Sequence, residues 1–191
     1  MNNQKTKHKQ LADLYVPYSN CQLCPLAVLG RTNVVFGSGN PNAKLLIIGE
    51  APGQNENQQG LPFVGRSGIL LDKIFQTIGF KREEIYITNV VKCLPPNNRQ
   101  PKPIEISQCK KILLEKQIHI IAPQVICTLG AVAANALLEN THSLSTLRGK
   151  LQHYNSIPVL VTYHPAYILR KPTAFTFLLQ DIEKAYKLTL K

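Results

Sequence analysis

The sequence has no tryptophan, a single methionine and few acidic residues. Among its 191 residues, 11 Asp and Glu stand against 22 Lys and Arg, which gives a formal net charge of +11. This shortage of acidic side chains favours a polyanionic partner, most simply a nucleic acid. An anionic membrane surface or a requirement for solubility would account for the same charge, and the charge alone leaves these alternatives open.

Long apolar runs and internal repeats are missing as well. The longest apolar stretches have the length of a strand, which excludes a membrane-spanning helix. The basic N-terminus MNNQKTKHKQ lacks a following apolar run, so it does not have the form of a secretory signal. We therefore expect an intracellular, cytoplasmic protein with one domain over residues 1–191, of which residues 1–18 are a basic N-terminal segment.

Short apolar runs alternate with segments of helical spacing along the chain. Buried strands are expected at residues 44–50, 84–91, 124–130 and 157–164. Helices are expected at residues 65–79, 104–120, 131–138 and 174–190. This alternation predicts an α/β fold in which a parallel sheet is covered on both faces. Ligands of such sheets bind beyond the carboxyl ends of the strands, which directs attention to Glu50, Asn89, Gly130 and His164.

Three of these strand ends carry unusual residues. Residues 49–65, GEAPGQNENQQGLPFVG, form a loop rich in polar and turn-forming residues, with little helix or strand character. Asn89 stands where an apolar residue would be the easy choice, so it is either a capping group or a recognition group. His164 is followed by Pro165, which fixes the backbone beside the imidazole. A lone histidine at a strand end is usually structural, but the three features together indicate a binding site.

Four of the five cysteines are spaced as metal ligands would be. Cys21 and Cys24 form a two-residue clip, and Cys93 and Cys109 lie beside loop signals with 15 residues between them. Four thiolates can close a tetrahedral metal site or hold an iron–sulfur cluster, and the spacing alone does not choose between zinc and iron. A clip of this kind can also be a redox pair or a chance occurrence. Cys127 lies in an apolar run and is expected in the core.

Several motifs in one order resemble those of a known family. The motifs are GEAPGQNENQQGLPFVGRSG, TNVVKCLPPNNRQP, LRGK and HPAYILR, together with the four spaced cysteines. From about Cys21 to the C-terminus the chain resembles the family-4 uracil-DNA glycosylases, the iron–sulfur members of their superfamily. The resemblance implies a three-layer α/β/α sandwich with a central four-stranded parallel sheet. It also implies a [4Fe–4S] cluster on Cys21, Cys24, Cys93 and Cys109, with Cys127 outside the ligand pattern.

The activity implied by the resemblance is hydrolysis of the N-glycosidic bond of uracil in DNA, which leaves an abasic site. The catalytic residues would be Glu50, Asn89 and His164. His164 would donate a hydrogen bond to uracil O2 as the base leaves as an anion. Asn89 would pair with N3–H and O4, whereas cytosine reverses both groups. Glu50 would add negative charge or orient the attacking water, although the superfamily's better-known branch has an Asp at the position of Ala51, and this role stays a hypothesis.

Further residues are implied to bind the substrate. Phe63 would stack on the extruded base, and Glu56 would lie on the wall that excludes the methyl group of thymine. The alternatives are core packing for Phe63 and a solvated loop for Glu56. The family usually has an acidic residue after this Glu, but this chain has Asn57, so nothing is transferred to that position.

Contacts to the DNA complete the predicted site. Backbone amides near Gly53, Gly65 and Ser67 suit phosphate groups. Tyr167 and Ile168 are spaced for a wedge that opens the duplex, although the first turn of a packed helix would have the same pattern. The remaining predicted substrate-binding and cationic positions are Ala51, Arg170, Lys92 and residues 147–150.

The predicted partners are uracil-containing DNA, single- or double-stranded, and uracil, with replication or repair proteins as further candidates. A nucleoid-associated monomer that does not bind membranes is expected. Two other functions are an electron-transfer protein and a nucleic-acid-binding module that has lost activity. A third is a relative that traps uracil covalently through a histidine in an insert near LRGK. Here His153 lies nearby but no insert is present.

Overall fold

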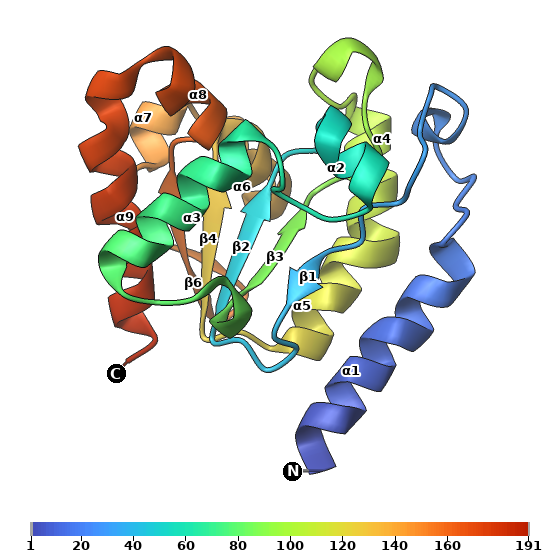
Figure 1. Cartoon of the computed structure of the whole chain (residues 1–191), viewed down its shortest axis with the longest axis horizontal. Helices are drawn as coiled ribbons and strands as arrows, with labels where there is room; N and C mark the ends of the chain where they lie inside the picture. Colours follow the sequence, from blue (N-terminus) through green and yellow to red (C-terminus); the bar gives the residue numbers. More distant parts are fainter. Residues whose placement is uncertain (1, 191) are drawn as a thin grey trace.

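The computed structural model describes residues 2–190, and its centre is a six-stranded mixed sheet (Figure 1). The strand order is β1-β3-β2-β4-β6-β5, and β3, β2, β4 and β6 run parallel. The strands are β1 (Ser38–Gly39), β2 (Leu45–Gly49), β3 (Tyr86–Asn89), β4 (Val125–Leu129), β5 (Gln152–Tyr154) and β6 (Ile157–Thr162). Residues 1 and 191 of the expected domain lie outside the described residues.

The prediction of four parallel strands is confirmed, but the sheet is larger than expected. β1 pairs with β3 and β5 pairs with β6, both antiparallel, so a short strand is added at each edge. These edge strands contain two and three residues, which is too short for an alternating pattern to be recognised. The predicted four-stranded sheet is therefore the central part of a six-stranded one.

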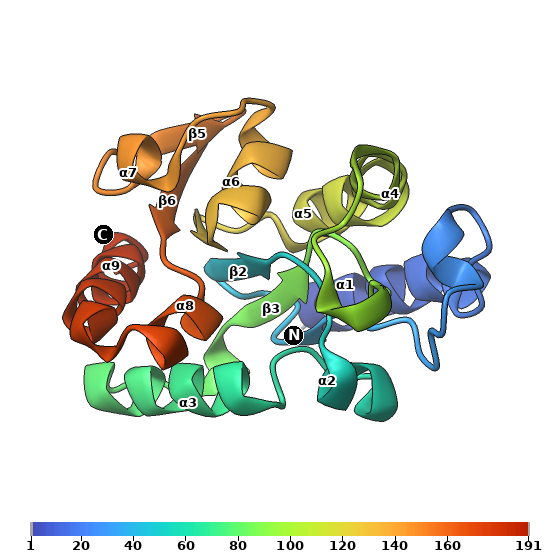
Figure 2. The ribbon, with the colours of Figure 1, turned by 90° about the horizontal axis from the view of Figure 1, so that it is seen from above.

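Helices cover both faces of the sheet, which gives the three layers α/β/α (Figure 2). On one side lie α3 (Arg66–Ile78), α8 (Pro165–Arg170) and α9 (Phe175–Leu188). On the other lie α1 (Asn2–Tyr15), α4 (Pro103–Cys109), α5 (Glu115–Ile121) and α6 (Ala131–Leu138). The short helices α2 (Gln54–Gln59) and α7 (Leu144–Leu147) complete the set of α-helices in residues 2–190.

Alternation of side chains divides the interior into two cores. In β2, Leu46 and Ile48 pack beneath α5 and α6, whereas Leu45 and Ile47 pack against α3 and α9. All residues of β2, β3 and β4 are buried, as expected for parallel strands covered on both faces. This burial on both faces explains why the strands read as continuous apolar runs in the sequence.

The helices α1 and α2 are among those that the sequence did not predict. The basic N-terminal segment forms α1, and Nζ of Lys7 donates to the carbonyl oxygen of Ile121 at the end of α5, at 2.8 Å. The polar loop at residues 49–65 contains α2, although its sequence has little helical character. Both helices rest on contacts with distant segments, which outweigh local propensity.

The predicted helix at residues 104–120 is present but not regular. A π-helical turn, Lys110–Leu114, joins α4 to α5 directly after Cys109. Such turns are rare and often accompany functional sites. Within residues 2–190, every helix is too short or too polar to cross a bilayer.

Candidate active site

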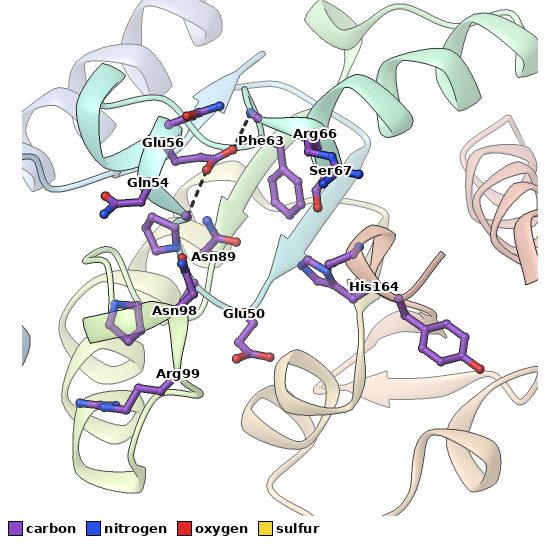
Figure 3. A pocket seen from close by; sticks show the side chains of 18 of the residues that line it. Glu50, Gln54, Glu56, Phe63, Arg66, Ser67, Asn89, Asn98, Arg99 and His164 are labelled. Carbon is purple, nitrogen blue, oxygen red and sulfur yellow. Dashed lines mark hydrogen bonds between the residues drawn. The ribbon is translucent and has the colours of Figure 1, made fainter. Parts of the chain in front are cut away.

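A cavity of about 580 Å³ opens at the carboxyl ends of the parallel strands (Figure 3). Its walls come from the segment after β2, the end of β3, the loop before α4 and the start of α8. Of the twelve non-cysteine site residues predicted, eleven line it: Glu50, Ala51, Gly53, Glu56, Phe63, Gly65, Ser67, Asn89, His164, Tyr167 and Arg170. The twelfth, Ile168, is 3% exposed and packs in the core between α3 and α9, so its prediction as a wedge is wrong.

Phe63, Asn89 and His164 meet at the base of this cavity. A Cβ atom added at Gly49 would lie 2.3 Å from Oδ1 of Asn89 and 2.5 Å from Cζ of Phe63. Only glycine at the end of β2 allows the amide and the ring to approach so closely. The Phe63 and His164 rings have centroids 6.0 Å apart, which leaves the imidazole facing the same space.

The imidazole of His164 is held in one orientation by the start of α8. Its Nδ1 accepts a hydrogen bond from the backbone N–H of Ala166, at 3.1 Å. Burial, with a smaller contribution from the charge of Arg170, lowers the pKa of His164 to about 4. The ring is therefore neutral at physiological pH, and since Nδ1 is an acceptor the proton is on Nε2.

Asn89 and Glu50 present polar groups that the protein leaves available. Asn89 is 1% exposed, and its Oδ1 has no hydrogen-bond partner within residues 2–190. A buried acceptor of this kind costs free energy unless a ligand supplies a donor. Burial raises the pKa of Glu50 above its ordinary value, and Glu50 is one of the residues that line the cavity (Figure 3).

The carboxylate of Glu56 organises one wall of the cavity. Its Oε1 accepts from the backbone N–H groups of Val64 and Gly65, at 2.9 and 2.8 Å, and its Oε2 accepts from Gly53, at 3.1 Å. These bonds join the start of α2 to the start of α3 (Figure 3). The amides of Gly53 and Gly65 already donate to Glu56, which differs from the expectation that they contact phosphate. Asn57, the position where this chain departs from the family, accepts from the N–H of Thr32, at 2.9 Å.

The loop before α4 adds residues that the sequence analysis missed. Pro95, Asn98 and Arg99 line the cavity, and Asn98 has a left-handed backbone with φ of 53°. Arg99 forms two bonds, of 2.8 and 2.7 Å, to the carboxylate of the fully buried Glu105. The PPNNR segment was part of a recognised motif, so consecutive asparagines, which tolerate this backbone, were the available signal. The other missed residues are Pro52, Gln54, Asn55, Arg66 and Ala166.

The four spaced cysteines line a second cavity, whose walls are apolar. Cys21 and Cys24 come from the segment after α1, Cys93 from the segment after β3, and Cys109 from the end of α4. Burial raises the pKa of Cys93 to about 12 and that of Cys109 to about 11. Within residues 2–190, no three His, Cys, Asp or Glu side chains are grouped to hold a single metal ion. Cys127 is fully buried in β4, and its core placement is confirmed.

Two predicted cationic contacts are taken up inside the protein. Lys92 is fully buried, and its Nζ donates to the carbonyl oxygen of Asn89 at 2.7 Å and to Oε1 of Gln117 at 2.6 Å. Arg148, in the LRGK segment, pairs with Asp181 at 2.6 Å and lies over the Phe177 ring. The prediction that Lys92 contacts phosphate is wrong, because its ammonium group is sealed from solvent.

Comparisons with known proteins find relatives over most of the chain. Residues 36–187 match the family model described as the uracil DNA glycosylase superfamily. The chain is 44% identical to a type-4 uracil-DNA glycosylase of Thermotoga maritima, over 86% of this chain and 87% of the relative. It is 41% identical to the type-4 enzyme of Sulfurisphaera tokodaii, over 90% and 81%. A type-5 uracil-DNA glycosylase of Thermus thermophilus is 30% identical, over 62% and 67%.

Proposed function

The chain belongs to the uracil DNA glycosylase superfamily, and from this premise we propose how its residues release uracil. The enzyme is a DNA-repair hydrolase, a uracil-DNA glycosylase. We propose that it hydrolyses the N-glycosidic bond between uracil and deoxyribose, with free uracil and an abasic site as products. The observation that carries the proposal is the buried Oδ1 of Asn89, which has no hydrogen-bond partner among residues 2–190 and lies beside Phe63 and His164 in one cavity.

Asn89 is proposed to select uracil. Its Oδ1 would accept from N3–H, and its amide would donate to O4 of the base. Cytosine presents an acceptor and a donor in the reverse order, which would leave buried groups unpaired at a cost of roughly 1–3 kcal/mol each. Phe63 would stack on the extruded ring, as aromatic side chains commonly do in enzymes that act on single bases.

His164 is proposed to stabilise the departing base. With Nδ1 occupied by the Ala166 amide, the Nε2–H group is the available donor, and it would bond to uracil O2. This bond strengthens as negative charge develops on the base, so it lowers the barrier more than it stabilises bound substrate. The low pKa of His164 supports the role, because the ring keeps its geometry without a positive charge.

Glu50 and Glu56 are proposed to have separate duties. Glu50 projects into the cavity from the end of β2, where its carboxylate would orient water and oppose the positive charge on the sugar. The carboxylate oxygens of Glu56 accept hydrogen bonds from three backbone amides, so Glu56 would exclude thymine by holding the cavity wall in place. Both roles follow from where the carboxylates lie, and neither requires a metal ion.

Cys21, Cys24, Cys93 and Cys109 are proposed to hold a [4Fe–4S] cluster. Four sulfur donors around one apolar cavity match the ligand set of such clusters. When bound, the cluster would cross-link remote segments of the chain. It would also hold the four cysteines as thiolates, a form that buried thiols do not reach alone. The residues around it then fix the loop that carries Pro95, Asn98 and Arg99.

The DNA is proposed to enter across the mouth of the cavity. Arg66 and Arg170 are exposed there and would meet phosphate groups, in keeping with the net charge of +11. Ser67, at the start of α3, and Ala51 would complete the contacts to the nucleotide. Tyr167, which lines the cavity, would fill the space left in the duplex. We also propose a cytoplasmic, nucleoid-associated location, because the substrate is there.

The experiment is an alkali-cleavage assay on an oligonucleotide with one uracil, with wild type beside Asn89→Ala, His164→Ala and His153→Ala. Wild type and His153→Ala should give equal product, because His153 is exposed on β5. His164→Ala should reduce the single-turnover rate by roughly 10²–10³. No product from wild type, or full activity in His164→Ala, would overturn the proposal. A denaturing gel tests covalent trapping, for which a DNA adduct lost in His153→Ala would be required.

A further inference from the structure

The backbone of Phe63 adopts a conformation that its own side chain disfavours. Its φ is 52°, in the left-handed region, where residues other than Gly, Asn and Asp are uncommon. Phe63 is also 5% exposed, and its ring closes the base of the cavity beside Gly49. A strained residue in a binding site persists only where its surroundings hold it.

The guanidinium group of Arg82 is hydrogen-bonded to this strained segment. Arg82 belongs to the short 3-10 helix η3 (Arg82–Glu84), between α3 and β3. Its Nη1 donates to the carbonyl oxygen of Phe63 at 2.9 Å, and its Nη2 donates to that of Pro62. Nη1 also donates to Oδ1 of Asp72 on α3, at 3.0 Å. The planar fork of arginine suits two adjacent carbonyl groups, which a lysine could not hold in the same way.

The first turn of α3 presses on the same carbonyl group. A Cβ atom added at Gly68 would lie 1.8 Å from the carbonyl oxygen of Phe63 and 2.2 Å from its carbonyl carbon. The backbone of Phe63 is therefore fixed between Gly68 and the fork of Arg82. This backbone sets the position of Cβ, and because the side chain is only 5% exposed, the ring has little freedom left.

We propose that Arg82 is a positioning residue for base recognition, which acts by holding the Phe63 ring in the plane on which the extruded uracil stacks. The inference deepens the proposed function and rests on it. The simpler reading is a surface ion pair between Arg82 and Asp72, whose side chains are 24% and 42% exposed. The two readings differ in the atoms that matter: the carbonyl groups of Pro62 and Phe63 in one, and the Asp72 carboxylate in the other.

The test measures the inhibition constant of free uracil, which reports the base pocket, beside the affinity for abasic-site DNA, which reports the remaining interface. Arg82→Met keeps the aliphatic stem and removes the fork, and Asp72→Asn is the matched control. Arg82→Met should raise the uracil inhibition constant about tenfold, because part of the stacking of the base on the Phe63 ring would be lost. It should leave the affinity for abasic-site DNA within about twofold. Asp72→Asn should leave both values within about twofold. Arg82→Lys, which offers a single point of donation, should lie between wild type and Arg82→Met.

A double variant decides whether Arg82 acts through the ring. In a Phe63→Ala background, Arg82→Met should change the uracil inhibition constant no further, because the group that it positions is gone. Multiplying effects, an equal effect of Asp72→Asn, or an unchanged inhibition constant in Arg82→Met would overturn the proposal. If Arg82→Met does not fold, Arg82→Lys carries the same cycle. Uracil release by wild type with no effect at Arg82 would refute this inference alone, whereas no release by wild type would refute the proposed function.

Discussion

The two cavities of this protein are built on opposite plans. The proposed base-binding cavity carries polar side chains, and several of them come from the ends of parallel strands, so the sheet itself sets their spacing. The cysteine cavity is apolar, and its ligands come from a segment after α1, the segment after β3 and the end of α4. The first can be assembled by folding alone, whereas the second brings together segments that only a bound group would cross-link. The comparison separates residues for chemistry from residues for architecture.

Lys92 is the residue that joins the two cavities. It lines the cysteine cavity, while its ammonium group donates to the backbone of Asn89, which selects the base in our proposal. Its charge and its backbone N–H oppose the rise that burial causes in the pKa of Cys109. Burial lowers the pKa of Lys92 to about 7, and the neighbouring cysteines offset part of this effect. The two cavities have different linings, but Lys92 connects them structurally.

The largest effect is expected from removing one of the proposed cluster ligands. Cys109→Ala should abolish iron binding and lower Tm by on the order of 10 °C, because a structural metal site contributes folding free energy directly. Cys127→Ala is the matched control, since this buried cysteine lies outside the cysteine cavity, and it should keep its iron. Iron analysis and visible absorbance of anaerobically prepared protein provide the measurement. Zinc without iron in wild type would contradict the cluster, although the cross-link could stand.

A smaller effect on iron binding, with a comparable effect on stability, is expected from Lys92→Met, which acts on both cavities at once. The substitution leaves the Asn89 carbonyl and Gln117 Oε1 without their donor, at roughly 1–3 kcal/mol each. A loss of about 3 kcal/mol would lower Tm by roughly 6–12 °C. We expect weaker uracil inhibition and weaker iron retention together. Lys150→Met, at an exposed lysine, should cost less than about 0.5 kcal/mol. A change confined to one cavity would show that the two are independent.

The smallest effect concerns pH and the base-binding cavity alone. Burial raises the pKa of Glu50, so its carboxylate takes up a proton at a pH above the ordinary Glu pKa of about 4.3. Activity that needs the ionised carboxylate should therefore begin to fall above that pH as the solution is made more acidic. His164, with its pKa of about 4, stays neutral through that fall. Single-turnover rates should therefore show an acid limb in wild type that is absent from Glu50→Gln. An identical limb in both would remove Glu50 from the mechanism.

The same groups set opposite trends in stability. The pKa of His164 is lower in the folded protein than its ordinary value of about 6.5, so its contribution is complete above about pH 6.5. That contribution is lost as pH falls towards 4, because the unfolded chain takes up the proton first. Glu50 has a raised pKa, so its neutral form favours the folded state at low pH and this contribution is lost as pH rises.

The sequence was a good guide where local chemistry and strand ends coincide. Asn89 ends one strand of strong apolar pattern and His164 follows another, so the sheet topology alone brings them to the same edge of the sheet. Burial could not be assigned as safely. Ile168 falls one turn into α8, where the helix faces the core, and Lys92 bends back toward β3. Neither direction is encoded in the residue type, because both depend on packing against segments distant in the chain.

The α2 helix shows a second limit. Its sequence, QNENQQ, gives no apolar face, and the helix is stabilised at its start by Glu56 bonded to Gly53. Since the other oxygen of Glu56 bonds to Val64 and Gly65, α2 depends on a loop that follows it. A pattern search within six residues cannot detect such a partner.

The π-helical turn after Cys109 bears on how this helix could be altered. A π turn contains one residue more than an α-helical turn, so the extra residue is held within Lys110–Leu114 while α4 and α5 continue on either side. Each residue of an α-helix turns the chain by about 100° around the helix axis. Deleting a single residue from the regular helix after Leu114 would leave Ile118 on the sheet only if the Cys109 thiol turned away from its neighbours. The π turn is therefore the part of this helix that can take a change of length, and in the regular turns beside it the same change would disconnect the thiol from its neighbours.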